Sequence, residues 1–383
     1  MLARAPGVRA VPHRRRAAGR RRGTAAARRV ICATLMAQPE HRFLRACRRQ
    51  PVDRVPVWLM RQAGRYQPSY RAVRAGVGFL ELCRSPELIA RVTAAPIDEF
   101  GLDAAILFSD ILIALPAMGL DLSFEKGEKG KGDGGPRIAN PVHTRADVDA
   151  LRVPEPSRDL PYVLEGVRAI RRVLADRVPL IGFAGGPFTV ASYAVEGGSQ
   201  GFTRLKTMLY EEPATAHALF EKLTEAAVVQ LQAQVDAGAQ AVQLFESWLG
   251  ELGRDDLEEF SFPYLARIAE ALRGSGVPTI FFATGTSTHL PQLAKLGYDV
   301  ISVDWRIPIA EARRQLPGSA LQGNLDSTLL LGPRARLLER VRALLEAVGH
   351  EPGYIFNLGH GILPPTPPEN VRALVDAVHA FRP

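Results

Sequence analysis

The chain has 383 residues, of which 46% are hydrophobic and 23% charged, a composition that excludes a fibrous or wholly disordered protein. Its net charge of +8 belongs to one end: residues 1–36 hold ten Arg and no acidic residue, so over residues 37–383 the other 38 basic residues face all 40 acidic ones. Because the body is almost neutral, the charge does not indicate a nucleic-acid-binding protein.

The basic segment 1–36 is rich in Arg and Ala and lacks an apolar stretch long enough for a secretory signal. These features are typical of an organellar transit peptide, so we predict that residues 1–36 are a targeting segment outside the fold. The alternative is an arm that binds nucleic acid or a membrane surface. No later segment has 18 uninterrupted apolar residues, so no membrane span is expected.

Cysteines are few and widely spaced. They stand at positions 32, 47 and 83, without a CxxC pair. This spacing argues against a disulfide framework and against a zinc ribbon.

The segment 54–80 carries five arginines and no Asp, Glu or Lys. At its centre, Arg61 and Arg65 flank Gln62, Ala63 and Gly64 in "MRQAGRYQPSY". Guanidinium groups bind carboxylates in a bidentate manner and stay charged at any working pH. The cluster therefore favours a polyanionic ligand, with pairing to acids distant in the sequence as the alternative.

From residue 86 onward, helical patterns alternate with short apolar runs bounded by turn residues. We predict helices over 86–100, 160–176, 213–236, 254–274, 333–348 and 368–381, and strands over 104–108, 179–184, 241–245, 278–283, 299–303, 319–322 and 353–358, with one more strand near 55–59 or elsewhere. The alternation predicts parallel βα units and one α/β domain over residues 37–383.

Polar residues follow five of these runs: Ser109-Asp110, Glu246-Ser247, Asp304, Gly323-Asn324 and Gly359-His360. A (β/α)₈ barrel of the TIM type carries its chemistry at the carboxyl ends of many strands, whereas a doubly wound sheet concentrates it at one crevice. We therefore predict a barrel, although ordinary turns also favour these residue types.

Two segments at strand ends are candidates for a site. Asp110 stands among apolar residues, so its carboxylate needs a partner; it is either a structural cap or ion pair, or a binding group in a cleft. Segment 187–198 offers the phenol of Tyr193, and Ser247 and His360 follow later strands. A single His is more often structural, but the glycines around His360 favour a site.

The segment 125–136, "EKGEKGKGDGGP", is predicted to be a solvated, flexible loop. It matches the spacing G-x-G-x-x-G of dinucleotide-binding turns, but Pro136 follows where a helix would begin. In so glycine-rich a stretch, chance explains the match better than a nucleotide site.

Six motifs together resemble the uroporphyrinogen decarboxylases over residues 38–383. They are "PVWLMRQAGRYQPSYR", "AAILFSDIL", "PLIGFAGGPFTVASYAVEGG", "QLFESWLG", "LQGNLD" and "NLGHG". The resemblance implies a distorted (β/α)₈ barrel, a homodimer and no metal or organic cofactor. It implies that the acetate side chains of uroporphyrinogen III are decarboxylated to methyls, which gives coproporphyrinogen III. Plants and algae house such enzymes in the plastid, so it also implies that residues 1–36 address the chain to the plastid stroma for haem and chlorophyll synthesis.

The resemblance also assigns roles to individual residues. Arg61 and Arg65 would bind substrate carboxylates, and Arg61 would also help to deliver a proton. Asp110 would accept hydrogen bonds from the pyrrole N–H groups. The other cleft residues that it implies are Gln62, Ala63, Gly64, Arg74, Tyr193, Phe245, Ser247 and His360. Segment 281–289, "FFATGTSTH", departs from the animal form of the family.

The chemistry of such a reaction agrees with the residues. A substrate with eight carboxylates requires uncompensated arginines, and the arginine segment supplies them. We expect the Arg charges to keep Asp110 ionised, which suits a group that stabilises positive charge and not a proton donor.

Two other functions remain open from the sequence. Related barrel methyltransferases use a Cys/His zinc site, but no Cys follows Cys83 here. A non-catalytic tetrapyrrole carrier would keep the arginines but would not need Asp110.

Overall fold

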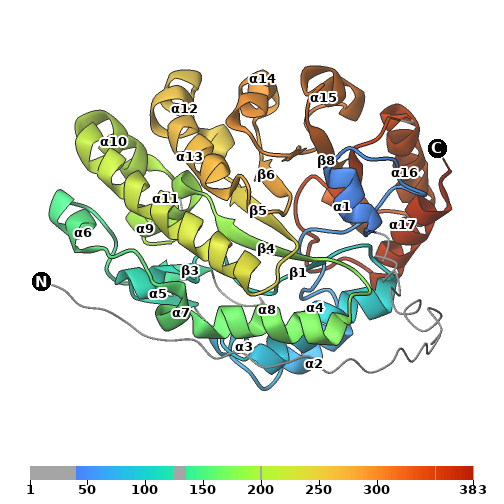
Figure 1. Cartoon of the computed structure of the whole chain (residues 1–383), viewed down its shortest axis with the longest axis horizontal. Helices are drawn as coiled ribbons and strands as arrows, with labels where there is room; N and C mark the ends of the chain where they lie inside the picture. Colours follow the sequence, from blue (N-terminus) through green and yellow to red (C-terminus); the bar gives the residue numbers. More distant parts are fainter. Residues whose placement is uncertain (1–39, 125–134, 199–200, 350, 383) are drawn as a thin grey trace, which may run out of the picture. The chain divides into compact units, whose positions relative to one another are not determined.

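The computed structural model describes residues 40–124, 135–198, 201–349 and 351–382. The predicted tail, residues 37–39 and most of the predicted loop 125–136 lie outside these ranges. We describe the unit from Glu40 onward by itself (Figure 1).

A parallel sheet forms the centre of this unit. Its strands are β1 (Ala105–Ile106), β4 (Leu180–Gly185), β5 (Ala241–Glu246), β6 (Thr279–Ala283), β7 (Val300–Ser302), β8 (Ala320–Leu325) and β9 (Tyr354–Leu358), paired in that order. Each coincides with a run predicted from the sequence. Because the order follows the chain without reversing, the sheet has no switch point, and the prediction of a barrel over a doubly wound sheet is confirmed.

The segment around Val57 lies between the first and last strands. Val57 forms a parallel bridge with Phe356 of β9, and Phe356 donates its N–H to Pro56 O at 2.9 Å. On the other side, Asp103 N–H donates to Val57 O at 2.8 Å. Since Asp103 lies two residues before β1, these bonds join the two edges of the sheet. The segment 55–59 was one of the places open to a further strand.

The helices lie around the outside of the sheet (Figure 1). They are α1 (Arg42–Cys47), α2 (Pro68–Arg74), α3 (Phe79–Leu82), α4 (Pro86–Phe100), α5 (Leu115–Met118), α6 (Arg145–Ala150), α7 (Pro156–Asp159), α8 (Pro161–Leu174), α9 (Pro187–Glu196), α10 (Thr203–Glu211), α11 (Pro213–Asp236), α12 (Arg254–Phe260), α13 (Phe262–Leu272), α14 (Leu290–Leu293), α15 (Ile309–Gln315), α16 (Arg334–Val348) and α17 (Pro368–Ala380). Short 3₁₀ turns occupy Leu249–Glu251, Ser287–His289, Ala294–Leu296 and Ser327–Leu331.

The helix predicted over 254–274 is in fact two helices, α12 and α13. Ser261 between them leaves the helical region, with φ −130° and ψ −57°. Pro263 explains the break, because it has no N–H to continue the hydrogen bonding of α12 and its ring disfavours a helix turn before it. Several shorter elements were not predicted. Among them are helix α9, within 187–198, and the antiparallel hairpin of β2 (Leu122–Phe124) and β3 (Pro136–Ile138). Pro136, the last residue of the predicted loop, therefore begins a strand.

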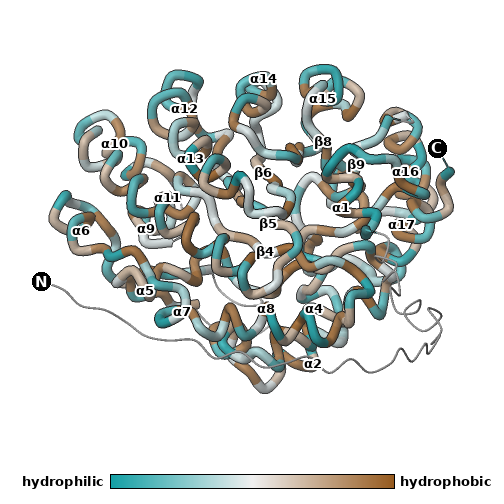
Figure 2. Tube along the Cα trace, viewed as in Figure 1, coloured by the Kyte–Doolittle hydropathy of each residue, from teal (hydrophilic) through white to brown (hydrophobic). Residues whose placement is uncertain are grey.

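Two apolar layers hold the unit together. Strands β4, β6, β8 and β9 are buried at every residue, as strands covered on both faces are. Helices such as α4 and α8 alternate apolar and polar segments along the tube (Figure 2), which lets one face pack on the sheet. Inside the barrel, Trp58 and residues at the starts of the strands pack with Phe43 of α1, so that α1 closes the amino-terminal end.

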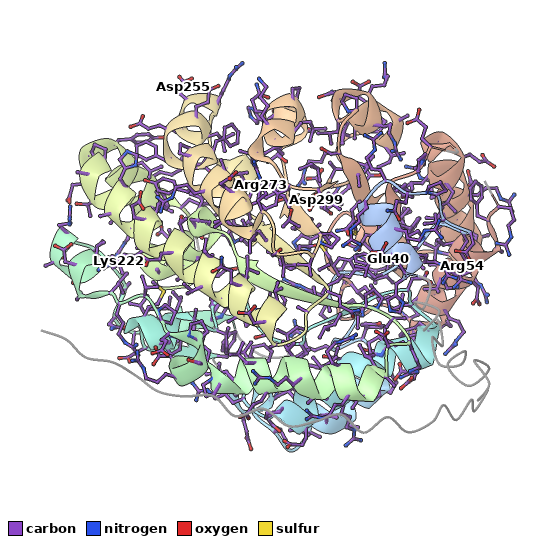
Figure 3. All side chains as sticks on the ribbon, viewed as in Figure 1. Glu40, Arg54, Lys222, Asp255, Arg273 and Asp299 are labelled. Atoms are coloured by element: carbon purple, nitrogen blue, oxygen red, sulfur yellow. The ribbon has the colours of Figure 1, made fainter. Side chains whose placement is uncertain are left out.

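A buried carboxylate fixes the junction where the sheet closes. Asp103 accepts hydrogen bonds from Arg42 Nη1 (2.7 Å), Arg54 Nη2 (3.1 Å) and Val57 N (3.0 Å), and His379 Nε2 of α17 lies 2.8 Å from it. Figure 3 labels Arg54 on this side of the molecule, near α17. The donors outweigh burial and lower the pKa of Asp103. Arg54, one of the five clustered arginines, therefore has a structural partner.

Among the residues that the structure covers, no helix is both long and apolar enough to cross a bilayer.

Candidate functional site

A cavity of about 460 Å³ opens at the carboxyl ends of the strands. This is the end at which barrel folds carry their chemistry. Its walls are largely aromatic and aliphatic, and its polar groups come from the loop after residue 59, from the residues after β1 and from the ends of later elements. Of the predicted site residues, those that line it are Arg61, Gln62, Ala63, Gly64, Arg65, Asp110, Tyr193, Phe245, Ser247 and His360.

The loop that carries Arg61 is a tight turn held by its neighbours. Arg61 has φ +59°, a left-handed conformation that is uncommon for a residue with a side chain. The buried Gln62 fixes this turn, because Leu59 N–H donates to its Oε1 and its own Nε2 donates to Ala104 O, both at 3.2 Å. The amide of Gln62 thus bonds the backbone, and its predicted contact with substrate stays a prediction.

Gly361 makes room for the Arg61 side chain. A Cβ at position 361 would lie 2.7 Å from Cγ of Arg61 and 2.9 Å from its Nε. Neither distance is tolerated between non-bonded atoms, so a side chain at 361 would push Arg61 aside. The sequence analysis quoted Gly361 within "NLGHG" without giving it a role. The sequence feature that could have indicated such a role is that His360 stands between two glycines, Gly359 and Gly361.

The arginine segment divides into structural and unpaired members. Arg71 donates to the carbonyls of Arg65 and Tyr66, each at 2.8 Å, and so braces the loop. Arg61 and Arg65 are exposed at the cavity, and within the described residues neither guanidinium has a hydrogen-bond or ion-pair partner. The alternative of pairing with distant acids thus holds for Arg54 and not for Arg61 or Arg65.

Arg74 is the one predicted site residue that does not line the cavity. It donates to Val77 O, and its guanidinium lies 5.8 Å from the ring centre of Phe79. Phe79 does line the cavity. Arg74 therefore lies behind Phe79, an aromatic residue of the cavity wall, and this arrangement does not place Arg74 in contact with a ligand.

Asp110 follows β1 and closes a turn with its own side chain. Its Oδ1 accepts the N–H of Leu112 at 2.9 Å. It is not a helix cap, because α5 begins at Leu115 with Ala114 before it, and within the described residues it forms no ion pair. Both structural alternatives for Asp110 are therefore absent here.

The pKa of Asp110 is raised above its ordinary value. Burial among apolar neighbours is the main cause, and the Leu112 N–H and the charge of Arg61 oppose it. We expected the arginine charges to keep Asp110 ionised at neutral pH, and that stays a prediction. In the ligand-free cavity burial outweighs the charge of Arg61, which acts on Asp110 without forming an ion pair with it.

Three further predicted residues complete the polar wall. His360 has its pKa lowered to about 4 by burial and by the charges of Arg61 and Arg306, so it is neutral at physiological pH. Burial is also the main cause that raises the pKa of Tyr193, while the neighbouring side chain of Trp248 lowers it. Ser247 lines the cavity next to Phe245 at the end of β5.

An aromatic lining surrounds these groups. The ring of Phe245 meets those of Phe183 and Phe282 edge-on, at centroid distances of 5.5 and 5.6 Å. Of these, only Phe245 was named beforehand. Phe183 and Phe282 sit inside strand patterns that look like ordinary core, so the sequence held no separate signal for them. The lining suits a ligand with a flat apolar body and charged edges.

Three other polar strand-end residues serve the fold. Asp304 accepts the N–H groups of Gly285 (2.6 Å) and Arg306 (2.9 Å), and Asn324 donates to the carbonyls of Asp304 and Ile307. Glu246 is buried and bonds the start of α9. Within the described residues, no group of three or more His, Cys, Asp or Glu is placed to hold a metal ion.

Comparison with known proteins agrees with this arrangement. The family model "Uroporphyrinogen decarboxylase (URO-D)" matches residues 38–381. Proteins named uroporphyrinogen decarboxylase from Anaeromyxobacter sp. Fw109-5 and Anaeromyxobacter dehalogenans are 78% and 80% identical over 341 residues, which is 89% of this chain and 99% of each relative. One from Myxococcus xanthus is 50% identical over 88% of this chain and 95% of its own length.

Solved structures share the fold. A methyltransferase from Methanosarcina mazei superposes with a TM-score of 0.73 at 26% identity, over 88% of this chain and 97% of its own. A B12-independent methionine synthase from Shewanella sp. W3-18-1 superposes with a TM-score of 0.52 at 13% identity, over 86% and 96%. The second likeness concerns the fold alone.

Proposed function

The chain belongs to the uroporphyrinogen decarboxylase family, and from that premise we propose how its cavity performs the reaction. The activity of the family is the decarboxylation of uroporphyrinogen in tetrapyrrole biosynthesis, and this chain has it. We propose that the substrate is uroporphyrinogen III, that its four acetate side chains become methyls, and that the products are coproporphyrinogen III and CO₂.

One observation carries the proposal: Arg61 and Arg65, whose guanidinium groups have no partner among the described residues, line the same apolar cavity as the carboxylate of Asp110. The substrate has carboxylates around its rim and pyrrole N–H groups at its centre. We infer that Arg61 and Arg65 bind rim carboxylates and that Asp110 accepts the central N–H groups. The aromatic lining would cover the faces of the pyrrole rings.

The same groups support a chemical sequence. Protonation of a pyrrole ring carbon makes that ring cationic, and the bond to the carboxylate then breaks, so that its electron pair neutralises the ring as CO₂ leaves. A second proton, added to the exocyclic carbon, forms the methyl group, and loss of the first proton from the ring carbon restores the aromatic pyrrole, so that one proton is consumed for each CO₂ released. Asp110 would stabilise the cationic ring electrostatically. We assign the proton delivery to no side chain, because Arg61 is too weak an acid.

The decisive experiment measures CO₂ released from uroporphyrinogen III by the full chain under anaerobic conditions, together with the mass of the tetrapyrrole product. Release of four CO₂ per substrate supports the proposal. Binding without release would instead indicate a carrier. Transfer of a methyl group without release would indicate the activity named for the Methanosarcina mazei relative.

Replacing Arg61 or Arg65 by Ala is expected to weaken substrate binding without unfolding the protein. A hydrogen bond between charged groups contributes about 1.5–3 kcal/mol, which corresponds to a loss of roughly ten- to a hundredfold in affinity. The measurement is KM and kcat for uroporphyrinogen III, with thermal melts of each variant. Gly361→Ala, which displaces the Arg61 side chain, should reproduce part of the loss.

The matched control is Arg336→Ala. Arg336 is exposed on α16 and pairs with Glu339 at 2.7 Å, so its loss should alter neither KM nor kcat. An Arg65→Ala variant that unfolds, while its folded fraction keeps full activity, would show that Arg65 is structural.

Residues 1–36 lie before the family match, and their plastid address stays a prediction. The relatives at 78% and 80% identity are bacterial and give it no support. A chain that begins at residue 37 is expected to keep full activity, because the matched region starts at residue 38. Import of a reporter fused to residues 1–40 into isolated plastids would support the address, and its exclusion would contradict it.

Assembly as a homodimer is likewise our proposal. Light scattering should give twice the 41.7 kDa of the single chain, less any targeting segment removed.

A further inference from the structure

Glu246, the last residue of β5, holds the start of a neighbouring helix. Its carboxylate is buried and accepts the N–H of Thr189 at 2.5 Å and the N–H of Phe188 at 3.3 Å. These are the third and second residues of α9. The first N–H groups of a helix have no partner within the helix, so an acceptor placed there satisfies them and also favours the positive end of the helix dipole.

Helix α9 has no cap of its own. Its N-cap is Gly186, which has no side chain, and Pro187 follows without an N–H. A Cβ on Gly186 would collide with the Glu246 carboxylate and lie 3.1 Å from Glu246 Cβ. Because Gly186 has no side chain, it leaves the space that the Glu246 carboxylate fills.

Two more hydrogen bonds join β5 and α9 at this point. Gly186 N–H donates to Phe245 O at 2.8 Å, and Trp248 N–H donates to the Thr189 hydroxyl at 3.2 Å. We call the set of bonds among Gly186, Phe188, Thr189, Phe245, Glu246 and Trp248 the β5–α9 joint.

The joint lies between three residues of the cavity wall. Phe245 and Ser247 are the residues on either side of Glu246, and Tyr193 lies one turn beyond Thr189 on α9. The indole of Trp248, whose backbone belongs to the joint, is close enough to the phenol of Tyr193 to lower its pKa. The charges of Asp110 and Arg61 both act on that phenol, so its position matters to the centre of the cavity.

We propose that Glu246 is a positioning residue: through the start of α9 it sets where Tyr193 stands relative to Asp110 and Arg61 during the reaction. The inference rests on the decarboxylase function proposed above. Glu246 itself does not line the cavity and touches no substrate, so its influence is transmitted by the β5–α9 joint.

The charge of Glu246 supplies a readout that a merely structural contact would not give. Burial raises its pKa to about 7, against the two N–H groups and the Thr189 hydroxyl, which lower it. The phenol of Tyr298 is the titratable group on which the Glu246 charge acts in turn. When Glu246 is ionised, its two oxygens accept the N–H groups of Phe188 and Thr189. When it is protonated, one of these oxygens carries a hydrogen and is a weaker acceptor. The joint is therefore strongest above pH 7 and weakens as the pH falls through this value.

Glu246→Gln tests the inference. Glutamine keeps the size, and its oxygen can still accept from Thr189, but its NH₂ then faces the N–H of Phe188, donor against donor. We expect kcat to fall about tenfold with KM changed less than threefold, and the part of the pH profile of kcat that rises near pH 7 in the wild type to disappear. In a Tyr193→Phe background, Glu246→Gln should lower kcat much less, because its effect is transmitted through Tyr193.

The matched control is Asn370→Ala. Asn370 is a buried residue of α17 that donates to the carbonyls of Leu330 and Gly332, so its loss removes one buried and one partly buried hydrogen bond away from the cavity. It should lower the melting temperature but leave kcat and the pH profile unchanged. If Glu246→Gln does not fold, Thr189→Val, which removes the hydroxyl of the joint, should show the same selective loss of kcat in milder form.

The outcomes separate the two proposals. A wild-type chain that releases no CO₂ overturns the proposed function. A wild-type chain that does, with a Glu246→Gln variant of unchanged kcat and pH profile, overturns the positioning role alone. Equal costs of Glu246→Gln with and without Tyr193 would also overturn it. If only Thr189→Val folds and its kcat is normal, the inference fails in the same way.

Discussion

Asp110→Asn is expected to lower the turnover of uroporphyrinogen III by about a hundredfold or more, the loss that follows when one oriented electrostatic group is removed from a transition state. Asparagine keeps the size of the side chain but removes the charge, and it places an amide donor where the pyrrole N–H groups need an acceptor. Asp110→Glu keeps the charge and displaces it by about one bond length, so it should retain more activity than Asn. Turnover of both variants, with thermal melts, gives the comparison.

The raised pKa of Asp110 adds a pH signature. Because burial favours the neutral acid in the free cavity, a larger fraction of Asp110 is protonated at a given pH than of an ordinary aspartate. As the pH is lowered, kcat/KM should therefore begin to fall at a higher pH than an ordinary aspartate would give. The control is Asp98→Asn, since Asp98 is exposed and pairs with Arg177 at 2.7 Å away from the cavity. Near-normal turnover of Asp110→Asn would exclude a charge role for this residue.

Asp103→Asn is expected to destabilise the fold by about 3 kcal/mol, the low end for breaking a buried ion pair. The low end applies because Arg42 and Arg54 are partly exposed and regain water when Asp103 is lost. Such a loss is a large part of the 5–15 kcal/mol of a typical domain. Urea unfolding of the variant and the wild type measures it.

Asp53→Asn is the matched control for this change. Asp53 binds the same guanidinium, with its two oxygens 3.0 and 2.9 Å from Arg42, but its side chain is 65% exposed, so its loss should cost less than about 1 kcal/mol. The pKa of Asp103 is lowered in the fold. Its contribution is therefore present above the pKa of the unfolded chain and is lost as the pH falls through the folded value. Equal destabilisation by both variants would contradict the importance of burial here.

The strands were predictable because their signal is local. Each apolar run between turn residues became a strand, and the barrel followed from polar residues at the strand ends. Helix α9 was missed because its residues, "PFTVASYAVE", are small and apolar and continue the pattern of β4 without a polar face. The hairpin of β2 and β3 was missed because its two short strands flank the glycine-rich segment and pair across it.

For the site, residue types were predictable and their partners were not. The absence of acids around Arg61 and Arg65 correctly indicated guanidiniums that have no partner in the part of the chain that the structure describes. Yet nothing local distinguishes them from Arg54, whose acid stands 49 positions away at Asp103. The direction of the Asp110 pKa depends on how burial compares with the distance to Arg61, and a sequence contains neither quantity. The same holds for Gly361, whose role is visible only once Arg61 lies against it.

Closure of the sheet through Val57 has a consequence for synthesis on the ribosome. Val57 pairs with Phe356 of β9, so a segment that is synthesised early cannot complete its pairing until the last strand of the sheet has been synthesised. Arg61 follows Val57 by four residues in the same turn-bearing stretch. The loop that carries Arg61 can therefore take its final shape only after nearly the whole barrel has left the ribosome, and until then the edge of the sheet on the side of β1 lacks its partner strand. Nascent chains that stop before residue 356 should thus be inactive and should depend on chaperones, however complete their first βα units are.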